Sequence, residues 1–435
     1  MASVVWNEET AAHLYRRAAF GATPAEIASA LRDGLGETVE KLVEYEGVSN
    51  AALDSRLARL ALDLTNLGGI SRWWVTRMTF TARPLEERMT LFWHDHFATA
   101  ISKVGDAGLM LMQNDLFRRH ALGNFVELTV EVSKDVAMLI WLDNFTSVKD
   151  HPNENYGREL LELFTLGQGF YSELDVLSAA KAFTGWTISR RTREFIYRDD
   201  LHDHSQKDFL GRVGDWNGDD IVRIACGEFA HGQLIARKLF SYFAWENPGS
   251  EIVNRFAQIY LDAGNEIKPL VKAILLSDEM YTPEAVWRKV KSPVDHTVIA
   301  KRQMLIDDDR ASRLAGSAMS AQGQTLFNPP DVDGWSSGLA WISSGSILSR
   351  MNLGNSMMLF FDPARFLQGA AFSTAEAMVD VFLKRLGPVV VSDETRSKLI
   401  AYVAPDGVLP AGTPLLVKQR GLAHMIVSLP EWQMY

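Results

Sequence analysis

Apolar residues recur at helical spacing along most of this chain, and this periodicity limits the fold more than any other feature. The first twenty residues and the segments 67–97, 154–167, 172–186 and 219–307 all show it. Residues 107–144 read as one long amphipathic helix. Thr23, Pro24 and Glu26 form a helix-start signal, with a capping threonine, proline in the first turn and glutamate three positions after the cap. The sequence therefore predicts an all-α fold built as a large multi-helix domain.

Two segments break the helical pattern. Residues 187–198 are rich in β-branched and aromatic side chains, so at most a small β-hairpin is expected near 187–213. Residues 324–345 are rich in Pro, Gly, Asp and Trp and predict a long structured loop. Long loops in compact helical proteins are usually functional. We expect a helical domain over 1–360 that carries the polar motifs, and a C-terminal helical extension over 361–435 packed on it.

The bulk composition excludes several classes of protein. The 435 residues are 47% apolar and 23% charged, which is enough to bury a large core. The net charge of −10 is spread along the chain and no Lys/Arg-rich run occurs, which argues against a nucleic-acid partner. No apolar run reaches the roughly 20 residues that a membrane span needs. The start lacks a secretory signal pattern, so we expect a cytoplasmic protein, or a periplasmic or exported one if a leader was removed.

A polar stripe in residues 151–167 is the first candidate site. On a helix, Asn155, Arg158, Glu159 and Glu162 fall on one face, at positions i, i+3, i+4 and i+7. Two carboxylates one turn apart can divide acid and base roles, because repulsion and burial push their pKa values apart. Arg158 could hold an anionic substrate. The alternative is a surface salt-bridge face.

The second candidate is the triplet His94-Asp95-His96, which recurs as His202-Asp203-His204. Side chains at i and i+2 diverge on a helix, so His94 and His96 could share a metal ion only if the helix ended near residue 93. The simpler interpretation is one core histidine and one surface histidine. No metal site and no cofactor are predicted, because the chain has a single cysteine and neither a phosphate-binding P-loop nor an H-E-x-x-H motif.

The two irregular segments supply further candidates. His202, Asp203 and Lys207 lie close together and suit polar recognition or proton transfer. Asp331 and Asp333 could accept hydrogen bonds from hydroxyl groups, and Trp335 and Trp341 could stack on a sugar. Charged surface loops and buried tryptophans that pin a loop are the alternatives.

Six stretches together resemble a known bacterial family. They are RAAFGATPAEI, MTLFWHDHF, HPNENYGRELLELFTLG, DVLSAAKAFTGW, HDHSQKDFLG and FNPPDVDGWSSGLAWI, which occur in this order over about residues 11–360. The sequence is similar to the family catalogued as domain of unknown function 1800. The family pattern resembles His-Asp followed by Lys, which matches His202, Asp203 and Lys207 and leaves His204 outside it.

The resemblance also implies a functional context. Members of the family resemble one another in being encoded beside proteins that look like sulfatases, which suggests a polysaccharide or other polar polymer as substrate and a sulfatase-like protein as partner. The motifs that carry the family are polar, which favours an active site at Asn153, Glu154, Asn155, Arg158 and Glu159.

These observations leave three hypotheses. The first is a hydrolase acting on glycans or related polar polymers. In it, Glu159 is the general acid or base, Glu162 or Asp95 is its partner carboxylate, and Trp335 is a stacking platform. Its substrate contacts would come from Asn153, Glu154, Asn155 and Arg158, from His202, Asp203 and Lys207, and from Asp331. His94 and His96 would orient neighbouring groups or carry protons. The second is a non-catalytic helical binding or assembly partner whose polar motifs form a buried network. The third is a metal-binding protein that uses His94 and His96.

Overall fold

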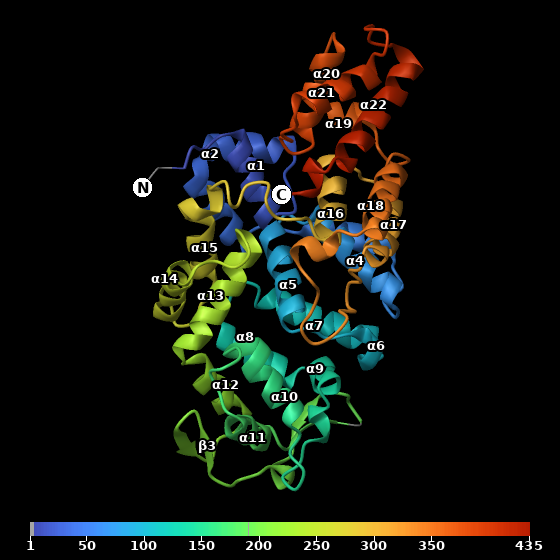
Figure 1. Cartoon of the computed structure of the whole chain (residues 1–435). Helices are drawn as coiled ribbons and strands as arrows, with labels where there is room; N and C mark the ends of the chain where they lie inside the picture. The colour runs from blue at the N-terminus through green and yellow to red at the C-terminus, as the bar shows by residue number, and fades with distance from the viewer. Residues whose placement is uncertain (1–3, 190) are drawn as a thin grey trace.

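The computed structural model describes residues 4–189 and 191–435, and most of these residues are helical, as predicted (Figure 1). Residue 190, inside the expected strand segment 187–198, lies outside the described residues. The helices are α1 (Glu8–Ala18), α2 (Pro24–Val43), α3 (Ala51–Leu60), α4 (Leu67–Phe80), α5 (Pro84–His96), α6 (Ile101–Val104), α7 (Ala107–Arg119), α8 (Phe125–Lys134), α9 (Val136–Trp141), α10 (Glu154–Glu159), α11 (Glu173–Ala182), α12 (Gly218–Cys226), α13 (Phe229–Phe243), α14 (Ser250–Asp262), α15 (Ile267–Leu276), α16 (Pro293–Gln303), α17 (Arg310–Ala321), α18 (Ser344–Met357), α19 (Pro363–Leu367), α20 (Ala375–Arg385), α21 (Asp393–Val403) and α22 (Gly412–Ser428).

Several helix starts follow the local sequence signals. The Thr23 hydroxyl accepts the backbone N–H of Glu26 at 3.3 Å, and the Glu26 carboxylate accepts the N–H of Thr23 at 2.6 Å, so the predicted capping box is confirmed. Ser172 and Asp175 form the same arrangement at the start of α11. Gly34, with φ +79°, breaks the helical backbone of α2 into two parts.

The segment 107–144 differs from the prediction, because it forms three helices and not one. The Asn124 side chain accepts the backbone N–H groups of Val126 and Glu127 and starts α8. The Asp135 side chain accepts the N–H of Met138 and starts α9. These caps stabilise two new helix starts inside an apolar run whose periodicity continues across them.

The small β content consists of two hairpins in the region where one was expected. Strands β1 (Trp186–Ile188) and β2 (Phe195–Tyr197) pair antiparallel, with Thr187 opposite Ile196. Strands β3 (Lys207–Phe209) and β4 (Arg212–Gly214) form the second antiparallel pair.

Helix α5 lies in the middle of the molecule, between two apolar clusters (Figure 1). It contributes Met89 and Trp93 to one cluster and Leu91 to the other. Helices α19–α22 lie at one end of the molecule, and α10, α11 and the β-hairpins lie at the opposite end (Figure 1). No helix in the described ranges is long and apolar enough to cross a bilayer. The expected division at residue 360 stays a prediction.

Candidate functional site

The His-Asp-His triplet forms the last turn of α5, where all three side chains meet other segments of the chain. Because the helix continues through His96, the two histidines point in different directions. His94 is buried against the rings of Trp74 and Trp335, and its Nε2 accepts the backbone N–H of Phe327 at 3.1 Å. Burial lowers the pKa of His94 to about 3, so its ring is neutral at physiological pH.

His96 connects α5 to two other helices. The Lys238 Nζ of α13 donates to His96 Nδ1 at 3.1 Å, so the N–H of the ring lies on Nε2, 3.2 Å from the carbonyl oxygen of Phe164. Burial holds the pKa of His96 well below its usual value. Both ring nitrogens therefore have protein partners, which fits a structural connection and not a metal ion shared with His94.

Asp95 binds the loop over residues 324–345. Its carboxylate accepts the backbone N–H of Trp335 at 2.8 Å. Gly334 has φ +85°, and a Cβ there would lie 2.7 Å from the carbonyl oxygen of Asp95, so only glycine fits this contact. Burial raises the pKa of Asp95 to about 6. We call His94, Asp95 and His96 the α5 hub, because together they hold the loop, α13 and the 160–165 segment.

Lys238 is a site residue that the sequence interpretation missed. It donates to the Leu163 carbonyl at 3.0 Å as well as to His96. Burial lowers its pKa to about 8, while the charges of Asp95 and Asp333 act in the opposite direction. A signal was present, since Lys238 lies seven positions after the buried His231 and therefore on the same helix face.

The stripe predicted over 155–162 is interrupted by a change of helix type. Residues Leu160–Thr165 form a π-helical turn, in which the Leu166 N–H donates to the Leu161 carbonyl at 2.9 Å. Such turns are rare and often occur at functional sites. The side chain of Glu162 consequently leaves the stripe and accepts hydrogen bonds from Gln168 and from the Tyr171 hydroxyl.

Several other residues of this motif serve local structure. Asn153 caps α10 through the N–H of Asn155 and donates to the Asp143 carbonyl at 3.1 Å. Arg158 pairs with Glu173 at 2.7 Å and with Glu154 at 3.2 Å. The Asn155 side chain is exposed. These contacts match the salt-bridge alternative for this face.

Glu159 has a different environment. Its side chain is half-buried, and within residues 4–189 and 191–435 its carboxylate has no hydrogen-bond or ion-pair partner. Burial raises its pKa, and the neighbouring charges of Glu162 and of Asp333 in the loop raise it further. The pKa of Glu162 is instead lowered, by its hydrogen bonds from Gln168 and Tyr171. The charges of Glu162 and Asp333 thus act on Glu159, and Asp333 also acts on Lys238 beside the α5 hub.

The third motif stabilises the hairpin region. Lys207 is buried and donates to the carbonyls of Asp203 at 2.6 Å and Ser205 at 3.0 Å and to the Asp215 carboxylate at 3.1 Å. His202 Nδ1 lies 2.9 Å from the Thr184 carbonyl. These contacts are with the hairpins and the chain after α11, and not with the α5 hub.

The remaining loop residues divide between surface and core. Asp331 is exposed and accepts the N–H of Asp333 at 3.0 Å. Trp335 is only 8% exposed, with its ring 5.3 Å from that of His94, and Trp341 is buried as well. The stacking role proposed for these tryptophans is therefore not supported, because their faces are covered by protein.

The same loop contains Gly334-Trp335-Ser336-Ser337-Gly338, which matches the G-x-S-x-G pattern of hydrolase nucleophile elbows. The elbow requires a strand before the serine and a helix after it. Here the serine follows an irregular loop and precedes a short 3₁₀ turn, Gly338–Trp341. The pattern therefore carries no nucleophile assignment.

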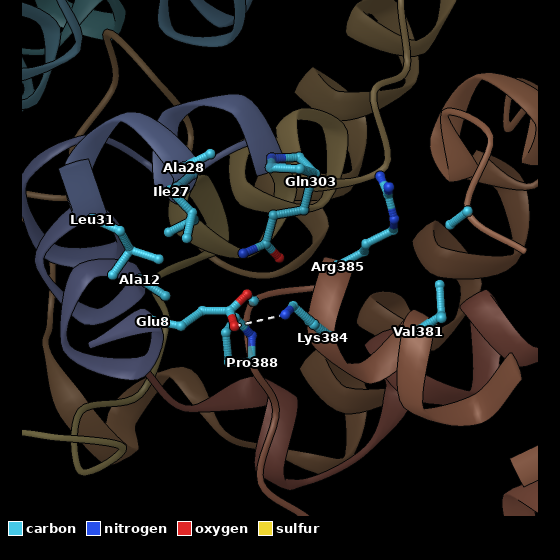
Figure 2. Close-up of a pocket in the computed structure, with 14 residues that line it drawn as sticks. Glu8, Ala12, Ile27, Ala28, Leu31, Gln303, Val381, Lys384, Arg385 and Pro388 are labelled. Atoms are coloured by element: carbon cyan, nitrogen blue, oxygen red, sulfur yellow. Dashed lines mark ion pairs between the residues drawn. The ribbon is translucent and has the colours of Figure 1, made fainter. Parts of the chain in front are cut away.

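A cavity of about 380 Å³ lies elsewhere, between α1, α2 and α20 (Figure 2). Ala12, Ile27 and Leu31 form its apolar wall, and the Gln303 side chain points into it (Figure 2). The ion pair of Glu8 and Lys384, 2.8 Å apart, lies at its edge. The only carboxylate in this lining is neutralised by its lysine, so acid/base chemistry has a better candidate in Glu159.

The fold and these contacts define an all-α protein in which the His94 triplet, the 160–165 turn and the 324–345 loop meet around the end of α5. The chain belongs to the family described as protein of unknown function (DUF1800), whose model matches residues 13–434 and so continues past residue 360, where the resemblance was expected to end. Comparison with curated proteins gives no match, and comparison with solved structures gives none either.

Proposed function

We propose that this protein is a hydrolase-type enzyme in which Glu159 is the general acid or base. One observation carries the proposal: Glu159 and Glu162 are neighbouring carboxyls whose pKa values are shifted in opposite directions. Shifts in opposite directions separate the two carboxyls, which is the direction that a division into acid and base roles requires. Among the described residues, Glu159 is also the motif carboxyl that has no hydrogen-bond donor.

Two groups at the α5 hub, close to the segment that follows Glu159, have pKa values near neutral pH. Lys238 has a pKa of about 8 and Asp95 a pKa of about 6, and each charge stabilises the other. In this proposal they are positioning residues, which hold the loop and the 160–165 turn on either side of Glu159. The α5 hub histidines are neutral and bonded to protein, so their role is orientation and not proton transfer.

Glycans or related polar polymers are the proposed substrate class, because a carboxyl pair is the chemistry of glycoside hydrolysis. Asp331 and Asp333 are exposed carboxylates on the loop beside Glu159 and could accept hydrogen bonds from substrate hydroxyls. The sulfatase-like partner rests only on the family resemblance.

The test is a hydrolysis screen of polysaccharides and of sulfated and phosphorylated esters with wild type and Glu159→Gln. Glutamine keeps the shape of the side chain but cannot exchange a proton, so turnover should fall about 10²–10⁴-fold at an unchanged melting temperature. Glu154→Gln is the matched control, because Glu154 lies on the same helix but is exposed and paired with Arg158. Its turnover should stay near that of wild type.

A second candidate function is a non-catalytic binding or assembly partner. It is favoured by the α5 hub, because all three of its side chains serve to hold other segments of the chain. This candidate predicts that none of the proteins turns over any substrate in the screen. Turnover that depends on Glu159 would exclude it.

A further inference from the structure

The second His-Asp-His triplet lies beside an aspartate from the following loop. His202, His204 and Asp215 each offer one ligand atom, and these atoms lie within 4.8 Å of one another. The two imidazole rings are nearly perpendicular, with centroids 4.9 Å apart. His202 is buried, whereas His204 and Asp215 are exposed. Two imidazoles and a carboxylate are ligands that zinc prefers.

A neutral histidine that binds a metal ion through one ring nitrogen carries its proton on the other. In both His202 and His204, a hydrogen-bond acceptor already lies beside that second nitrogen. His202 Nδ1 lies 2.9 Å from the Thr184 carbonyl, so it carries the proton and leaves the lone pair on Nε2. His204 Nε2 lies 3.3 Å from the Asp199 carboxylate, and its Nδ1 lies 3.5 Å from Asp215 Oδ2. With its proton on Nε2, His204 presents the Nδ1 lone pair toward Asp215. Carbonyl and carboxylate partners of this kind orient histidines in metal sites.

Lys207 fixes the carboxylate of the set. Its Nζ binds Asp215 Oδ1 at 3.1 Å, which leaves Oδ2 on the side of His204. The lysine adds one positive charge, but Asp199 and Asp215 supply two negative charges. The net charge of these three side chains is therefore negative, which favours binding of a cation.

We propose that His202, His204 and Asp215 bind one divalent transition-metal ion, with zinc as the best match. Zinc–nitrogen bonds of about 2.0–2.1 Å place tetrahedral ligand atoms about 3.4 Å apart, so the exposed His204 and Asp215 must move inward by about 1 Å. The fourth position is open to water. The site lies in the hairpin region, shares no residue with the Glu159 site, and does not depend on the proposed hydrolase function.

The test is a zinc titration of the full chain, freed of metal by chelation, in competition with a chromogenic chelator. Wild type should bind about one equivalent of zinc, and zinc should raise its melting temperature. His204→Ala should weaken binding by more than about 100-fold, because it removes a direct ligand. Asp199→Ala should weaken it about 10-fold, which is typical for loss of an outer partner.

His424→Ala is the matched control, because His424 lies on α22 and binds the Met351 carbonyl of α18, outside the hairpin region, so its loss should leave zinc affinity unchanged. His204 and Asp199 are exposed, so their variants should fold as wild type does in zinc-free buffer. A wild-type chain that takes up no zinc would overturn the proposal. So would His204→Ala protein that binds zinc as tightly as wild type.

Discussion

Replacing Asp95 by asparagine should make the folded protein more stable at neutral pH. Asparagine has nearly the same shape, and its carbonyl oxygen can still accept the N–H of Trp335. The substitution removes a negative charge that burial disfavours, because the pKa of Asp95 is raised from 3.8 to about 6. A carboxylate that stabilises the folded state usually has a lowered pKa instead.

The size and the pH window of this effect follow from that pKa. The folded protein holds the proton of Asp95 more tightly than the unfolded chain does, so this group lowers stability as pH rises from about 4 to about 6. At about 1.4 kcal/mol per tenfold change in proton affinity, the full effect is about 3 kcal/mol. With an unfolding entropy of about 2.1 cal/mol/K per residue, the 435-residue chain should melt about 3 °C higher at pH 7.5. At pH 4 the difference should vanish.

The assay is calorimetric melting of wild type and Asp95→Asn at pH 4 and pH 7.5. Glu87→Gln is a control of opposite sign, because Arg118 and Arg77 hold the pKa of Glu87 at about 2 against the effect of burial. Its loss leaves two buried guanidinium groups short of a partner and should destabilise the protein by about 3–5 kcal/mol at neutral pH. An Asp95→Asn protein that melts below wild type at pH 7.5 would refute the reasoning.

Three further predictions concern the same region. Gly334→Ala should destabilise the protein by more than about 1 kcal/mol, because its φ of +85° and the contact with Asp95 exclude a Cβ; thermal melting and limited proteolysis of the loop measure this. Arg158→Met should change stability by no more than about 1 kcal/mol, because its ion pairs are exposed; a larger loss in chemical denaturation would show that they are structurally important. Lys238→Met should remove the gain in stability that wild type shows as pH rises above about 8, since the lysine pKa is lower in the folded state; an unchanged pH–stability curve would contradict this assignment.

The fold was largely predictable because local signals set most helix boundaries. The cap at Thr23 appears where the sequence places it, with Pro24 in the first turn of α2. The starts of α8 and α9 were missed because apolar periodicity runs through Asn124 and Asp135 and hides the caps. Helical periodicity is easier to recognise in a sequence than the points at which one helix ends and the next begins.

The candidate site was less predictable, because its contacts join segments far apart in the chain. The polar motifs were identifiable, but the bond between His94 and Phe327 spans 233 positions and has no local signature. The π-helical turn after Glu159 depends on packing, so the predicted α-helical stripe overestimated how closely Glu162 follows Glu159. Lys238 was missed because a single lysine in a helix usually indicates an exposed face.

The central claim is that Glu159 retains its proton to a higher pH than an ordinary glutamate while Glu162 does not. Carbon-detected NMR titration of the side-chain carboxyls measures both, with Glu159→Gln used to assign the Glu159 signal. We predict an apparent pKa above the ordinary value of 4.5 for Glu159 and below it for Glu162. A Glu159 carboxyl that titrates at or below 4.5, or two carboxyls that titrate together, would contradict the proposed acid/base pair.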